Sequence, residues 1–103
     1  MSENVFVKSG RTSNIIPNET ATTLTGNWVY KDSPKAAIQV VATAAATVVF
    51  DVSNDGINAL ATSLGTVTLA GAGSDGFTTD APWKYVRARI TANSGLVNVL
   101  MSV

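Results

Sequence analysis

Two residue types that carry much of enzyme chemistry are missing from this sequence. Its 103 residues include no His and no Cys. Ser-His-Asp and Cys-His nucleophiles, thiol redox chemistry, disulfides and zinc sites built on Cys or His are therefore excluded. The remaining candidates are carboxylates, two arginines and four aromatic side chains, and each has an ordinary structural role as its alternative.

The carboxylates of Asp51, Asp55, Asp75 and Asp80 could in principle supply a general acid–base pair. They fall at predicted strand ends and turns, where Asp is common because its side chain bonds the neighbouring backbone. Neither His, Cys nor a glycine-rich phosphate loop accompanies them. We therefore expect no catalytic residue, no cofactor and no enzyme activity.

Residues 51–56 begin like a calcium-binding loop, with the pattern D-x-[DN]-x-[DN]-G. The twelfth position is Thr62, where such a loop has a bidentate Glu, and the flanks are predicted strands where the loop has helices. A strand that ends in a hairpin explains the pattern better, so no metal site is predicted. A looser calcium site on Asp55, Asp75 or Asp80 is the alternative.

Four aromatic residues, Trp28, Tyr30, Trp83 and Tyr85, could contact a partner. In one interpretation they line a shallow sugar-binding face, as in sandwich-type carbohydrate modules. In the other they close the ends of the core or anchor a subunit interface, where Trp and Tyr are enriched. The second interpretation is favoured.

Arg87 and Arg89 share the outer face of one predicted strand. The chain has 7 basic and 7 acidic residues and no net charge, whereas binding to nucleic acid through counterion release needs a basic excess. Pairing with Asp51 across a sheet, or contact at a subunit interface, is favoured over DNA binding. The predicted interface residues are therefore Trp28, Tyr30, Trp83, Tyr85, Arg87 and Arg89.

The segments that must position these side chains alternate between apolar and polar residues, as half-buried strands do. The strands are predicted at residues 28–30, 36–43, 47–53, 66–70, 85–92 and 97–103. Val48, Phe50, Val52, Val86, Ala88 and Ile90 are predicted to form the core. Residues 54–56 and 93–95 have the composition of tight hairpin turns, and residues 70–76 are predicted to be a loop. Strands without helical segments between them predict an all-β fold, an antiparallel β-sandwich that is jelly-roll-like, with six to eight strands.

The first 25 residues are the least regular part of the chain. They contain a short possible strand at residues 5–7 and an apolar pair, Ile15 and Ile16, in a polar, turn-rich stretch. We divide the chain into an extended N-terminal arm or edge segment, residues 1–25, and a β-sandwich domain, residues 26–103. The sequence leaves open whether the first segment reaches onto a neighbouring subunit or folds on its own domain.

Targeting signals are not predicted. Glu3 and Asn4 stand where a signal peptide has basic residues, and no apolar core follows. No apolar run approaches 18 residues, so no membrane span is expected.

Three stretches carry a resemblance to a family: TVVFDVSNDG at residues 47–56, DAPWKYVRARIT at 80–91 and GLVNVLMSV at 95–103. Together with Trp28 and the KDSPK turn at 31–35, they resemble small β-sandwich virion proteins of tailed bacteriophages, over about residues 26–103. The first 25 residues have no counterpart in this resemblance.

The resemblance implies that the protein has a non-enzymatic structural role in the virion and is made in the host cytoplasm. The chain's small size favours a capsid decoration or cement protein that binds and stabilises the shell as a homo-oligomer. Its partner would be the major capsid protein or another virion protein. A neck, tail or fibre component, or a carbohydrate-binding module on a receptor-binding appendage, is the alternative.

Overall fold

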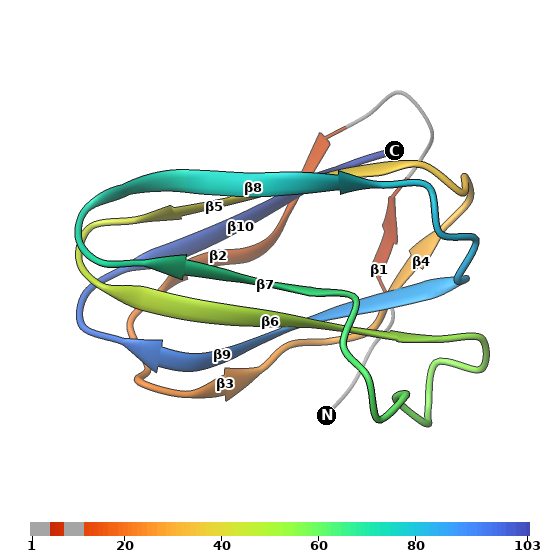
Figure 1. Ribbon diagram of the computed structural model, residues 1–103, viewed down its shortest axis with the longest axis horizontal. Coiled ribbons are helices and arrows are strands. Elements are labelled where there is room, and N and C mark those ends of the chain that lie inside the picture. Colours follow the sequence, from red (N-terminus) through yellow and green to blue (C-terminus); the bar gives the residue numbers. More distant parts are fainter. Residues whose placement is uncertain (1–4, 8–11) are drawn as a thin grey trace.

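The computed structural model describes residues 5–7, by their backbone, and residues 12–103, and these residues form strands without any helix (Figure 1). Short stretches of β-branched and apolar residues separated by turns account for this content. The ten strands are β1 (Val5–Val7), β2 (Thr12–Glu19), β3 (Leu24–Thr25), β4 (Val29–Lys31), β5 (Ala36–Ala42), β6 (Ala46–Ser53), β7 (Gly65–Leu69), β8 (Gly73–Thr79), β9 (Tyr85–Asn93) and β10 (Val97–Ser102).

The strands form two sheets that pack face to face (Figure 1). The six-stranded sheet has the order β1-β4-β9-β6-β7, with β3 also paired to β9. The four-stranded sheet has the order β2-β10-β5-β8. All pairings are antiparallel except β1 with β4. The predicted all-β antiparallel sandwich is confirmed.

The path of the chain between the sheets is that of a jelly roll. The chain crosses from one sheet to the other between β4 and β5, β5 and β6, β7 and β8, β8 and β9, and β9 and β10. Only β6 and β7 are consecutive neighbours within a sheet in this part of the chain. Eight strands, β2 and β4 to β10, make up this arrangement, and β1 and β3 are short additions to the six-stranded sheet.

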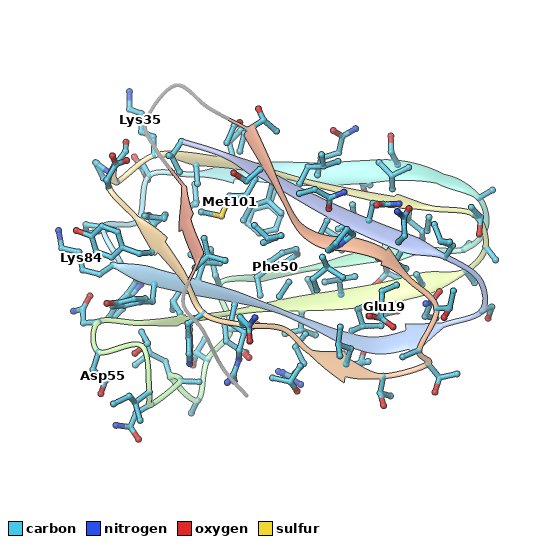
Figure 2. All side chains as sticks on the ribbon, turned by 180° about the vertical axis from the view of Figure 1, so that it is seen from behind. Glu19, Lys35, Phe50, Asp55, Lys84 and Met101 are labelled. Atoms are coloured by element: carbon cyan, nitrogen blue, oxygen red, sulfur yellow. The ribbon has the colours of Figure 1, made fainter. Side chains whose placement is uncertain are left out.

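The core lies between the sheets, where Phe50 and Met101 project in Figure 2. The alternation in β5, β6, β9 and β10 places every second side chain there, because successive side chains of a strand point to opposite faces. Phe50 also meets Phe77 of β8 edge to face, with ring centroids 5.5 Å apart. All six residues predicted to form the core are buried: Val48, Phe50, Val52, Val86, Ala88 and Ile90.

The N-terminal segment lies on the chain's own sandwich wherever it is described. Strand β2 pairs with β10 at one edge of the four-stranded sheet and buries Ile16. The pairing shifts register twice, and Asn18 after Pro17 has φ of 47°, so this edge is irregular. Residues 1–4 and 8–11 of the predicted arm lie outside the described residues.

The prediction of a loop at residues 70–76 is wrong for its second half. Strand β8 begins at Gly73 and pairs with β5 over seven consecutive residues. It is an edge strand with mostly exposed side chains, so it lacks the alternation from which a strand is predicted. Gly76 suits this strand because a Cβ there would collide with the carbonyl oxygen of Ile38 on β5.

Both predicted tight hairpin turns are also wrong. Gly56 does have a positive φ of 69°, but β6 and β7 are joined by a long loop, residues 54–64. The other predicted turn, residues 93–95, begins in the last residue of β9, and residues 94–96 connect β9 to β10, which belong to different sheets. Turn composition thus marked the places where strands end, while the path of the chain beyond them depends on tertiary packing.

The two ends of the sandwich differ in their connections (Figure 1). The long-loop end, at the right of Figure 1, consists of residues 32–35, 54–64 and 80–84. The short-turn end, at the left, consists of residues 20–23, 43–45, 70–72 and 94–96. In Figure 2, seen from behind, Lys35, Asp55 and Lys84 project at the long-loop end.

Candidate binding surface

A cluster of charges is built on the outer face of the six-stranded sheet. Asp51 of β6 stands opposite Arg87 of β9, and Arg89 lies two residues further along the same strand. Arg87 Nη2 lies 2.9 Å from Asp51 Oδ2, Arg89 Nε lies 3.1 Å from the same oxygen, and Arg89 Nη2 lies 3.1 Å from Oδ1. The predicted pairing of both arginines with Asp51 across the sheet is therefore present.

Asp51 departs from the prediction in its burial. The alternation of β6 puts its side chain on the outer face, yet the residue is only 4% exposed. Burial raises the pKa of its carboxyl, but hydrogen bonds and charges from Arg89 and Arg87 outweigh burial and lower the pKa below its ordinary value of 3.8. The carboxylate stays ionised because two guanidinium groups replace its water.

Trp28 belongs to the same cluster. The guanidinium carbon of Arg87 lies 4.5 Å from the centroid of the Trp28 ring, within range of a cation–π contact. Trp28 is buried. One face of Arg87 is thus occupied by an aromatic ring and its edge by a carboxylate, and both contacts are internal to the protein.

The other three predicted aromatic residues lie at or beside the long-loop end. Tyr30 and Tyr85 are cross-strand partners on β4 and β9, and their rings meet edge to face with planes 67° apart. Trp83, on the loop before β9, is partly buried against the core. A flat sugar-binding platform needs coplanar exposed rings, whereas Trp28 is buried and the rings of Tyr30 and Tyr85 are not coplanar.

A hydrogen-bonded hub fixes the start of the loop at residues 54–64. Asp55 Oδ1 accepts from the Ser53 hydroxyl at 2.6 Å and from the backbone NH groups of Ile57 and Asn58 at 2.8 Å each. Asp55 Oδ2 accepts from the Asn58 side chain at 2.9 Å. Hydrogen bonds from Ser53 and Asn58 lower the pKa of this exposed carboxyl far below its usual range.

This geometry bears on the calcium pattern of residues 51–56. The oxygens of Asp51 and Asp55 are engaged by guanidinium, hydroxyl and amide donors. Over residues 12–103 no three acidic side chains gather in a group that could hold a metal ion. Asp75 accepts from the NH of Gly76, and Asp80 lines an open groove with Lys35 and Ser102.

Lys31 is a buried charge that the sequence analysis did not single out. The residue is 2% exposed, and its ammonium donates to the carbonyls of Ala81 and Pro34 at 2.7 and 2.9 Å. Desolvation by burial, and then the nearby charge of Lys84, lower the pKa of Lys31 below 10.5. Lys31 thereby ties two loops of the long-loop end together. In the sequence, the burial of Lys31 is indicated only by its position, because the alternation of β4 points this side chain inward.

A concave site of about 180 Å³ lies beside this buried lysine, lined by Lys31, Asp32, Ser33, Pro34, Pro82, Trp83 and Lys84. Small-molecule pockets usually enclose about 300–1,000 Å³, so this site is small for a drug-sized ligand. Ile57, which projects from the neighbouring loop at 77% exposure, was also missed. No periodic signal could have found it, because it lies in an irregular loop.

The structure thus divides the six predicted interface residues into two groups. Trp28, Arg87 and Arg89 join Asp51 in the cluster on the sheet face. Tyr30, Trp83 and Tyr85 lie at or beside the long-loop end, where the loop of residues 54–64 approaches Tyr85: a Cβ at Gly56 would lie 3.2 Å from the Tyr85 ring.

No protein-family model matches this chain, and searches of curated proteins and of solved structures gave no match either. Within residues 12–103 there is no helix of the length and apolarity needed to cross a membrane.

Proposed function

We propose that this chain is a non-enzymatic structural protein of a tailed-phage virion, a decoration or cement protein that binds the shell as a homo-oligomer. The resemblance of residues 26–103 to small phage virion proteins is its starting point. The jelly-roll strand order is the observation that carries it. Jelly rolls recur in viral capsid proteins, lectin domains and cupins.

Fold alone does not determine function, so the choice among these classes depends on side chains. A lectin-type site would need exposed aromatic rings with a shared plane, whereas Trp28 is buried and Tyr30 meets Tyr85 at 67°. A metal-dependent or nucleophilic enzyme would have to do without His and Cys. A structural protein needs neither, only a rigid body with complementary surfaces.

The internal charge pairing favours the same choice. Asp51, the most deeply buried acid of residues 12–103, is neutralised by two arginines of its own sheet. A catalytic carboxylate needs a free oxygen and a tuned pKa, whereas the pKa of Asp51 is lowered by groups that also occupy it. This arrangement braces the sheet and leaves Asp51 occupied, not poised as an acid or base.

Co-sedimentation tests the proposal directly. The purified chain is mixed with empty shells of its own phage, with isolated tails of that phage and with a polysaccharide matrix. The mass of the free chain is measured separately by sedimentation velocity. We expect an oligomer that sediments with the shells. Binding only to tails would assign it to a neck, tail or fibre, and retention only on the polysaccharide would replace the structural role with a carbohydrate-binding one.

A further inference from the structure

The loop between β6 and β7 presents apolar side chains to solvent. Ile57 is 77% exposed and Leu60 is 41% exposed. Over residues 12–103 only one other large aliphatic residue is comparably exposed, Val41 of β5 at 36%. Ala59 and Ala61, beside Leu60, are exposed as well, so residues 59–61 form an exposed apolar stretch between the polar residues Asn58 and Thr62.

The loop is held in one shape by its own bonds. The Asp55 hub fixes the backbone of Ile57 and Asn58 from one side. Further on, the NH of Leu60 donates to the Val52 carbonyl at 3.1 Å, and the NH of Leu64 donates to the Phe50 carbonyl at 2.7 Å. A loop already ordered loses little conformational entropy when it binds, which favours its use as a contact.

Charge on the loop does not oppose an apolar contact. Asp55 is the one charged residue of residues 54–64, and its two oxygens accept four hydrogen bonds from Ser53, Ile57 and Asn58. Its charge is therefore compensated by donors within the loop. Removing Ile57 and Leu60 from water leaves no unpaired loop charge behind.

The size of this surface indicates what covers it. Two aliphatic side chains offer at most a few hundred Å², whereas a stable dimer buries about 800 Å² on each partner. A second copy bound through this loop alone would be held too weakly. A small contact is sufficient when a homo-oligomer, as proposed above, presents several linked copies of the loop to a repeated lattice, because avidity then multiplies weak contacts.

We infer that Ile57 and Leu60 form an apolar attachment knob that inserts into a hydrophobic socket on the shell protein. This inference rests on the proposed function and names the surface that performs it. It places the main contact at the long-loop end and away from the arginine cluster on the sheet face.

The test compares three forms of the full chain: the natural sequence, Ile57→Ser and Val41→Ser. Val41→Ser is the control, because it removes the one other large aliphatic side chain of residues 12–103 that is exposed, on a strand of the four-stranded sheet. Both variants should keep the natural melting temperature, since neither side chain is in the core. Co-sedimentation with empty shells should show at least a tenfold weaker association for Ile57→Ser and unchanged association for Val41→Ser.

The outcomes separate the inference from the proposed function. If the natural chain does not bind shells, the proposed function fails and the knob fails with it. If the natural chain binds shells and Ile57→Ser binds them equally well, the assignment of the attachment knob is wrong and the proposed function is still supported. If Ile57→Ser instead splits an oligomer of the free chain in sedimentation velocity, the loop's occupant is a second copy, which also overturns the socket.

Discussion

The two ends of the sandwich are closed in different ways. At the short-turn end uncharged groups bond the turns: the NH of Thr43 donates to the Leu96 carbonyl, and the NH of Ser94 donates to the Ala45 carbonyl. The Thr43 hydroxyl also accepts from the NH of Leu96, and the buried Asn93 amide donates to the carbonyls of Glu19 and Ala21. The four turns there contain no charged residue and no aromatic residue. At the long-loop end, side chains hold the loops, through the Lys31 ammonium and the Asp55 carboxylate.

This difference indicates where a partner can be recognised. Short turns closed by uncharged groups offer small side chains and little shape. Longer loops fixed by buried or saturated polar groups can carry exposed apolar residues without losing their conformation. In this protein the second arrangement occurs at one end only, and that end also carries Tyr30, Trp83 and Tyr85.

The largest expected effect comes from the core that both ends share. Phe50→Ala should lower the free energy of unfolding by about 3–5 kcal/mol, because it removes a fully buried ring and its contact with Phe77. Denaturant unfolding measures the loss, and amide hydrogen exchange should accelerate at both ends. Acceleration at one end alone would mean that the ends do not share one cooperative core.

Asp51→Ala should have the next largest effect, about 2–4 kcal/mol at pH 7, because it leaves two guanidinium groups without their carboxylate. The lower part of this range is favoured because Arg89 is more than one-third exposed and can be hydrated.

The pH dependence of this effect has a definite sign. The folded pKa of Asp51 is below the ordinary 3.8, so its stabilisation is complete above that value and is lost as pH falls through the folded pKa. The difference between the natural chain and the variant should therefore shrink in acid. Asp75→Ala removes an exposed carboxylate that has no ion pair within residues 12–103, so it is the control and should lose much less stability at pH 7.

A smaller effect distinguishes the two ends directly. Gly56 at the long-loop end has φ of +69°, and a Cβ there would meet the Tyr85 ring at 3.2 Å. Gly71 at the short-turn end has open space around it. Gly56→Ala should cost about 1 kcal/mol and speed exchange in residues 54–64, while Gly71→Ala should change stability by less than about 0.5 kcal/mol. Equal losses would contradict the contrast between the ends.

The body of the fold could be predicted because burial leaves a period of two. Strands β5, β6, β9 and β10 are buried on one face, and their alternation gave both the strands and the core. Strand β8 was not predicted, because an exposed edge strand containing Gly73 and Gly76 has no buried face and so shows no alternation of apolar and polar residues. Strand β2 was not predicted as a regular strand, because Pro17 and two register shifts interrupt its alternation of buried and exposed residues.

The candidate surface was predicted less completely. The pairing of Asp51 with Arg87 followed from alternation, since both lie outward on neighbouring strands. The burial of Lys31 did not, because it depends on carbonyls of Pro34 and Ala81, and Ala81 lies 50 residues away along the chain. Contacts of this kind depend on how loops from different sheets meet, which no local pattern encodes.

The smallest expected effect concerns Lys31 and its neighbour at the long-loop end. Burial and the charge of Lys84 hold the folded pKa of Lys31 below its ordinary 10.5. Between those two values the unfolded chain binds more protons than the folded chain, so the free energy of unfolding should rise with pH in that window. Lys84→Gln removes the like charge and should stabilise the protein at pH 7 by up to about 0.5 kcal/mol.

The gain from Lys84→Gln should disappear above the folded pKa of Lys31, where that amine is neutral and still donates to both carbonyls. Lys35→Gln is the matched control, because Lys35 is exposed at the same end and is not among the causes of the Lys31 shift. Urea unfolding of the three proteins between pH 7 and pH 10.5 makes the comparison. A gain from Lys84→Gln that persists at pH 10.5, or an equal gain from Lys35→Gln, would show that the ammonium of Lys31 is not what Lys84 opposes. The loops of this end would then be held by their carbonyl contacts alone, with the charge on Lys31 playing no part in their stability.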